Sequence, residues 1–248
     1  MKLKLLLFFS LALVLFSCTN KTEELVTDKL SDYMPLQPGK FIIYRLDSLS
    51  FTSFGTASVI TRYQVKHEVD AQIMDSQGRP TYRVYTYIRD SAGTQPWNPL
   101  GTILVTPLAS QMEVTEDNFR VIKLHLPITE GYHWPGNTYL PDDPYYPRYD
   151  LLNDNDMKFW DFTYDVFQPT ITYRGNTYKD VITVLEEDDH QNAPVTNVNQ
   201  FGYNTQSIEK YSKNIGLVYR KYEIWDYQTD PTKHYTGFGI TMWMIDHN

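Results

Sequence analysis

The stretch that decides the fold is Ser58-Val59-Ile60-Thr61-Arg62-Tyr63-Gln64-Val65-Lys66-His67-Glu68-Val69-Asp70. Every second position carries an apolar, ring-bearing or β-branched side chain, and the positions between are polar except for Ile60. The recurring set is Val59, Thr61, Tyr63, Val65, His67 and Val69. A period of two over this length predicts an antiparallel strand with one face against a core and the other in water.

The segments that follow extend this strand into a series of hairpins. Asp75-Ser76-Gln77-Gly78 has turn chemistry and Thr81–Asp90 is rich in Tyr and Val, so residues 58–90 predict a long hairpin. Residues 111–115 and 119–126 predict a second hairpin. Further strands are predicted at 41–45, 101–105, 160–166, 178–186, 207–211, 217–227 and 235–246. A short helix over 206–213 is the alternative at one of these places.

Together these segments predict a mainly β fold of antiparallel sheets, as a sandwich or an open barrel-like sheet, with about ten strands and little helix. A loop is predicted at Pro96–Pro99, because neither proline fits a central strand. Two longer loops are predicted at 128–149 and 187–205. The β body covers residues 33–248, and it remains open whether it consists of two halves that meet near 131–155.

The N-terminal segment has the layout of a secretory signal. Lys2 and Lys4 precede Leu5–Phe16, an almost unbroken run of Leu, Phe, Val and Ala. At about 1.5 Å per residue this run covers only half of a ~30 Å hydrocarbon core, so a permanent transmembrane helix is the weaker interpretation. The run ends at Leu15-Phe16-Ser17-Cys18, with the only cysteine of the chain. This ending resembles the lipobox of bacterial lipoproteins, whose cysteine is lipidated and becomes the first mature residue.

The lipobox resemblance implies a signal peptide at residues 1–17, a lipidated Cys18 with a flexible tether at 18–32, and the β body behind them. Several acyl chains on one cysteine give stable membrane anchoring. Since Thr19 stands where inner-membrane lipoproteins usually have Asp, an outer-membrane protein is expected, facing the periplasm or the cell surface. Two patches, 33–44 and 215–220, resemble uncharacterised outer-membrane lipoproteins of the Bacteroidota, a group without an established activity.

Composition restricts the range of partners. The chain has a formal net charge of −8 and no basic cluster, which argues against nucleic acid. It holds 20 Tyr, 12 Phe and 5 Trp, residues that favour strands and also form binding platforms. With a single cysteine, the body has no intramolecular disulfide. The expected partners are a membrane, through the lipid anchor, and either a glycan or an envelope protein.

No strong catalytic motif is present, and the sequence predicts no catalytic residue, no metal site and no cofactor. Glu186-Glu187-Asp188-Asp189-His190 is the densest titratable cluster. It is typical of a solvated acidic loop, with a calcium site or a hydrolytic carboxylate pair as alternatives. The run Asn153–Asp156 more often caps a turn than binds calcium, because its oxygen-bearing residues are contiguous and a glycine is missing.

The best binding candidates are the aromatic residues of the mid-chain loop. Their rings suit stacking on a sugar or on a protein partner, although rings in such a loop more often cover an open end of a core. The candidates are Tyr132, Trp134, Tyr139, Tyr145, Tyr146 and Tyr149. The favoured interpretation is a lipid-anchored envelope protein with a non-enzymatic binding or structural role. The alternatives are a glycan-binding accessory lipoprotein that uses these rings and a carboxylate-dependent hydrolase.

Overall fold

The structure is a computed structural model that describes residues 28–153 and 155–248. The signal peptide, Cys18 and the tether up to residue 27 lie outside the described residues, so lipidation stays a prediction. The described residues form one short helix, twelve strands and one 3-10 turn. These are α2 (Leu30–Tyr33), β1 (Phe41–Thr52), β2 (Ala57–Met74), β3 (Pro80–Asp90), β4 (Asn98–Pro107), β5 (Gln111–Glu116), β6 (Phe119–His125), β7 (His133–Pro135), η1 (Met157–Phe159), β8 (Asp161–Tyr173), β9 (Asn176–Gln191), β10 (Gly202–Ser212), β11 (Gly216–Gln228) and β12 (His234–His247).

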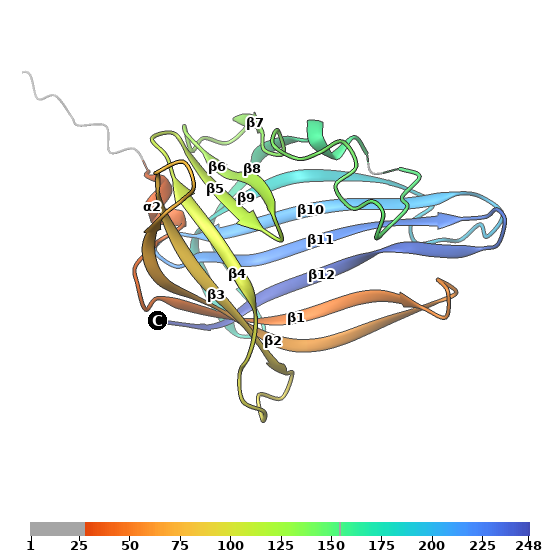
Figure 1. The fold of residues 1–248 in the computed structure, drawn as a ribbon, viewed down its shortest axis with the longest axis horizontal. Coiled ribbons are helices and arrows are strands. Elements are labelled where there is room, and N and C mark those ends of the chain that lie inside the picture. The colour runs from red at the N-terminus through yellow and green to blue at the C-terminus, as the bar shows by residue number, and fades with distance from the viewer. Residues whose placement is uncertain (1–27, 154) are drawn as a thin grey trace, which may run out of the picture.

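All twelve strands belong to one antiparallel sheet in the order β6-β5-β4-β3-β2-β1-β12-β11-β10-β9-β8-β7. Strands that are consecutive in the chain pair with each other, except β6 and β7, which form the two edges of the sheet. The first strand also pairs with the last, from Ile42↔His247 to Ser50↔Phe238. Figure 1 shows the sheet curled on itself, with β3–β6 steeply inclined to the long strands β1, β10, β11 and β12. The fold is therefore two meanders, β1–β6 and β7–β12, that share one nearly closed barrel-like sheet.

The two edges of the sheet, β6 and β7, meet at a seam. The Ile122 N–H donates to Gly136 O at 2.8 Å, and the indole N–H of Trp134 donates to Ile122 O at 2.8 Å. A Cβ at position 136 would lie 2.4 Å from the ring of Phe162, so only glycine permits this approach. These bonds satisfy polar backbone groups that an open edge would expose.

The mainly β prediction is confirmed, with twelve strands instead of about ten. Two local predictions were wrong. Asn98 and Pro99 begin β4, where the proline is accommodated beside a register shift between Thr86 and Tyr87 of β3. Residues 187–191, which were predicted to begin a loop, continue β9 and pair with β10. The strand predicted at 207–211 is confirmed as part of β10, and the alternative helix over 206–213 is not formed.

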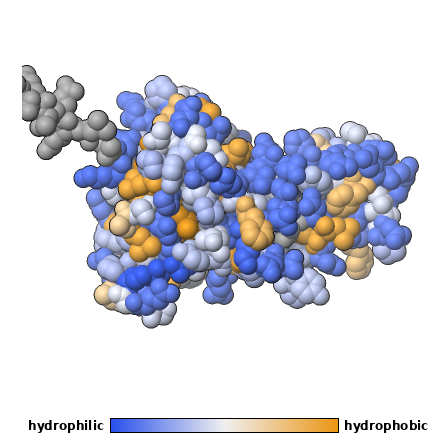
Figure 2. All heavy atoms as spheres, turned by 90° about the horizontal axis from the view of Figure 1, so that it is seen from above, coloured by the Kyte–Doolittle hydropathy of each residue, from blue (hydrophilic) through white to orange (hydrophobic). Residues whose placement is uncertain are grey.

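The segment before β1 packs against one end of the sheet. Leu30 and Tyr33 of α2 are 5% and 3% exposed, and the Tyr33 hydroxyl donates to Asp28 at 3.0 Å. None of the helices among the described residues is long and apolar enough to cross a membrane. On the face drawn in Figure 2 hydrophilic residues predominate, and apolar residues form several separate patches.

Candidate functional site

Five charged side chains meet inside the sheet, one from each of five strands. They are Glu116 of β5, Lys123 of β6, Glu186 of β9, Glu209 of β10 and Arg220 of β11, called here the ionic cluster. The curl of the sheet brings these strands face to face around one interior, although 104 positions separate Glu116 from Arg220. Glu116, Lys123 and Arg220 each line two cavities, so the cluster lies between them.

Lys123 and Arg220 connect the three carboxylates. Lys123 Nζ donates to Glu186 Oε1 at 2.7 Å and to Glu209 Oε1 at 2.9 Å. Arg220 donates from Nη1 to Glu116 Oε2 at 2.8 Å, and its Nε lies 3.4 Å from Glu209 Oε1. Side-chain exposure is 2% for both Glu186 and Glu209 and 38% for Glu116, which faces the cavities.

Burial and charge act in opposition on the pKa of each carboxyl group. Burial raises the pKa of Glu186 further than Lys123 lowers it, so the net shift is upward. For Glu209, burial is outweighed by the charges of Lys123 and Arg220, so its pKa is lowered. For Glu116, burial is outweighed by the charge of Arg220 and the hydrogen bond from it, which hold the pKa at about 2.

The charge count of the cluster adds to the upward shift that burial causes at Glu186. Three carboxylates face two cations, so full ionisation leaves one uncompensated negative charge among buried groups, which is costly. Glu186 touches only Lys123 among the cations and has a neutral partner, Ser207, whose hydroxyl donates to it at 2.5 Å. A proton on Glu186 would balance the cluster.

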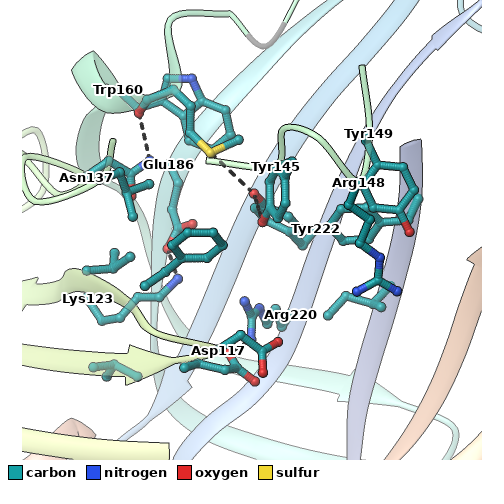
Figure 3. Close-up of a pocket in the computed structure, with 18 of the residues that line it drawn as sticks. Asp117, Lys123, Asn137, Tyr145, Arg148, Tyr149, Trp160, Glu186, Arg220 and Tyr222 are labelled. Carbon is teal, nitrogen blue, oxygen red and sulfur yellow. Dashed lines mark hydrogen bonds and ion pairs between the residues drawn. The ribbon is translucent and has the colours of Figure 1, made fainter. Parts of the chain in front are cut away.

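The larger of the two cavities, called the large cavity, has a volume of about 440 Å³. Figure 3 shows Lys123 and Glu186 on one side, Tyr145 and Tyr222 in the middle, and Arg148 with Tyr149 on the opposite side. Aromatic rings make up much of its wall, and they come both from the mid-chain loop and from the strands. These rings are Phe119, Tyr145, Tyr149, Trp160, Tyr222 and Phe238.

Hydrogen bonds fix the loop that forms the upper wall of the large cavity. The hydroxyls of Tyr145 and Tyr222 lie 2.7 Å apart, and burial raises the pKa of Tyr145 to about 12. The Asn137 amide donates to Met157 O at 2.9 Å. Tyr149 stacks on Phe238, with ring centroids 5.2 Å apart. The wall is therefore formed before any ligand arrives.

The structure separates the six predicted aromatic residues into three groups. Tyr145 and Tyr149 line the large cavity. Trp134 is 2% exposed in the seam, and Tyr132 stacks on it at 6.2 Å. Tyr139 and Tyr146 are 46% and 66% exposed and lie outside the large cavity.

The acidic residues of β9 point in different directions, because side chains alternate along a strand and a register shift against β10 at Glu186 interrupts the alternation. Glu186 faces the interior, whereas Asp188 accepts a hydrogen bond from the exposed amide of Gln206 at 2.9 Å. Asp189 accepts one from the hydroxyl of Tyr203 at 2.9 Å. Within the described ranges, no three His, Cys, Asp or Glu side chains are grouped so that they could hold a metal ion.

Sequence reasoning missed most of the ionic cluster. A signal was present in Ile122-Lys123-Leu124, where a charge interrupts an apolar strand, and in the alternation of Thr205, Ser207, Glu209 and Tyr211, all of which are buried. Buried charges need partners, so these positions indicate ion pairs, but the sequence does not show with which strands.

Comparisons with known proteins are sparse. No protein-family model matches the chain, and no curated protein matches it. Among solved structures, one similar chain is a "putative exported protein with YmcC-like fold" from Bacteroides fragilis NCTC 9343. The two share 12% sequence identity with a TM-score of 0.37, over 86% of this chain and 97% of the other. A likeness of this degree carries no conclusion about function.

Proposed function

We propose that the chain is a lipid-anchored envelope protein that binds a short saccharide in the large cavity. The observation that carries the binding role is one preformed space of about 440 Å³ that combines aromatic walls with charged groups. Ligand sites have volumes of about 300–1,000 Å³ and combine apolar walls with a few placed polar groups. The signal-like leader and the lipobox at Cys18 support the location, at the outer membrane and facing the periplasm or the cell surface.

The chemistry of the cavity suits a sugar. A pyranose presents apolar C–H faces that stack on aromatic rings, and Tyr149 with Phe238 offers such a surface. Its hydroxyls need donors and acceptors, which Arg148 and Asp117 supply at the exposed rim of the cavity. The acidic net charge of −8 disfavours a polyanionic ligand and leaves neutral saccharides as the favoured class.

The test is a binding measurement on the purified protein with a glycan array, followed by titration calorimetry on each hit. Tyr149→Ala removes a stacking ring and is expected to weaken binding about tenfold. Tyr146→Ala is the matched control, because Tyr146 belongs to the same loop but lies outside the cavity. Equal affinity in wild type and Tyr149→Ala, or a loss confined to Tyr146→Ala, would contradict a cavity-bound saccharide.

One observation favours a hydrolase as a second candidate. Glu186 and Glu116 line the same cavity, and their pKa values are shifted apart, upward for Glu186 and to about 2 for Glu116. A protonated acid and an ionised carboxylate are what glycoside hydrolysis requires. Oligosaccharides that bind would then be cleaved by the wild type, and Glu186→Gln would abolish product release without abolishing binding. If the wild type releases no product, the binding role alone stands.

A further inference from the structure

The second cavity, called the apolar cavity, lies on the other side of the ionic cluster and has a volume of about 130 Å³. Its lining comes from the segment before β1, from β1 to β6, and from β10 and β11. The aliphatic lining residues include Leu36, Val69, Val84, Ile103, Val105 and Leu217. Four of them, Val69, Val84, Ile103 and Val105, are between 5% and 8% exposed and form one packed cluster.

The size of this cavity limits its occupant. An enclosed apolar space of roughly 150 Å³ takes a benzene-sized molecule, so this cavity holds about six carbons. Water gains little there, because the valine and isoleucine side chains offer it no hydrogen bonds. The polar lining groups are those of the ionic cluster, which bind one another, together with Tyr44, His67 and Tyr211. The Tyr44 hydroxyl donates to Leu217 O at 3.0 Å, and the Tyr211 hydroxyl donates to Glu209. The part of the cavity beside the valine and isoleucine side chains therefore suits apolar groups.

Lys40 places a positive charge at the side of the apolar cavity that lies nearer to solvent. Its Nζ donates to Asn214 O at 3.3 Å and to Asn248 O at 3.0 Å, which leaves one of its three N–H groups for another acceptor. Burial lowers the pKa of Lys40. The ammonium thus has one free N–H group at the edge of an apolar space.

We propose that the apolar cavity binds an aliphatic chain of six to eight carbons whose terminal carboxylate pairs with Lys40. The hydrocarbon lies among Val69, Val84 and Ile103, and the carboxylate accepts the remaining Lys40 N–H. This site is independent of the proposed saccharide site, because the ionic cluster lies between the two cavities.

Octanoate is the probe that tests the proposal. On protein with labelled Ile, Leu and Val methyl groups, octanoate is expected to shift the NMR signals of Ile103 and Val84 in a saturable way. Lys40→Met is expected to weaken octanoate binding about three- to fivefold, the effect of losing a partly exposed ion pair. The same substitution should leave the affinity for octanol, which has no charge, unchanged.

Val84→Phe fills the cavity and should abolish octanoate binding, whereas Ile60→Phe, at a position that is 54% exposed on β2, should not. If Val84→Phe does not fold, the comparison of octanoate with octanol in Lys40→Met still decides whether a carboxylate pairs with Lys40. The proposal is overturned if octanoate shifts only Ile240 and Val121, which line the large cavity, or if Lys40→Met weakens octanol as much as octanoate.

Discussion

Replacing Lys123 by Met tests the role of the ionic cluster in stability. The substitution keeps an unbranched side chain but removes the charge that lies 2.7 Å from Glu186 and 2.9 Å from Glu209. Three carboxylates would then share Arg220 as the only cation of the cluster. Since both glutamates are 2% exposed, water cannot replace the lost partner.

The expected loss follows from the burial of the pair. Removing one partner of a buried ion pair costs about 3–5 kcal/mol of unfolding free energy. For a domain of this size, about 2–4 °C of melting temperature corresponds to 1 kcal/mol, so Lys123→Met should melt about 10 °C lower. The assay is urea unfolding at pH 7.5 with a parallel thermal scan. Lys179→Met, at an exposed position of β9, is the control and should unfold like the wild type.

The loss should also depend on pH. Without Lys123, the pKa of Glu186, which is already raised, rises further, and the pKa of Glu209 loses one of the charges that lower it. A carboxyl group whose pKa is raised above the unfolded value of about 4.3 destabilises the fold above that pH. The deficit relative to wild type should therefore shrink between pH 7.5 and pH 5. Lys123→Met/Glu186→Gln should recover part of it. A loss below about 1 kcal/mol, or a deficit that grows as the pH falls, would refute the electrostatic account.

Three further predictions concern separate parts of the chain. Burial lowers the pKa of His67 from 6.5 to about 4, so the unfolded state binds more protons than the folded state between these values. The free energy of unfolding should therefore fall by about 3 kcal/mol as the pH drops through this range, which NMR titration and urea unfolding of wild type and His67→Phe check. Gly237→Ala should cost about 2–4 kcal/mol in thermal unfolding, because φ is +114° and a Cβ would lie 2.2 Å from Ile224 O, whereas Gly78→Ala, with nothing within 4 Å, should cost about 1 kcal/mol or less. Cys18→Ser should abolish incorporation of labelled palmitate and release the protein from the membrane fraction.

The period-two pattern of residues 58–70 predicted β2 for a sound physical reason. A strand against a core must alternate, and Val65 and Val69 are 3% and 8% exposed. The same pattern failed at the start of the strand, where Val59 and Ile60 are 44% and 54% exposed. There β2 pairs only with β1, because its pairing with β3 begins at Tyr63↔Asp90, and alternation alone does not reveal where a core ends.

Local sequence patterns did not predict where some strands end or how the sheet closes on itself. Pro99 becomes part of β4 because a register shift in β3 accommodates it, and the acidic end of β9 is strand because β10 pairs with it. Both causes lie in the partner strand. The pairing of β1 with β12 joins residues about 200 positions apart, and no residue of either strand specifies this neighbour.

The aromatic loop shows what composition leaves open. Trp134 and Tyr149 are both rings in one irregular segment, yet one closes the seam and the other faces the large cavity. The difference comes from where each residue lies relative to the sheet. Trp134 lies within β7 and donates a hydrogen bond to β6, whereas Tyr149 lies in the loop after β7 and stacks on Phe238 of β12. Only the three-dimensional arrangement separates a structural ring from a binding candidate.

The existence of two cavities follows from the number of strands. In closed sheets about eight strands give an interior that side chains just fill, and a wider sheet leaves space. Twelve strands here enclose more than their own side chains occupy, even with α2 at one end and the loop after β7 over the sheet. The ionic cluster spans part of this space, because Lys123 and Arg220 have long side chains that reach carboxylates on other strands. Charges placed across the interior thereby leave an aromatic space on one side and an aliphatic space on the other, and each can be tested without the other.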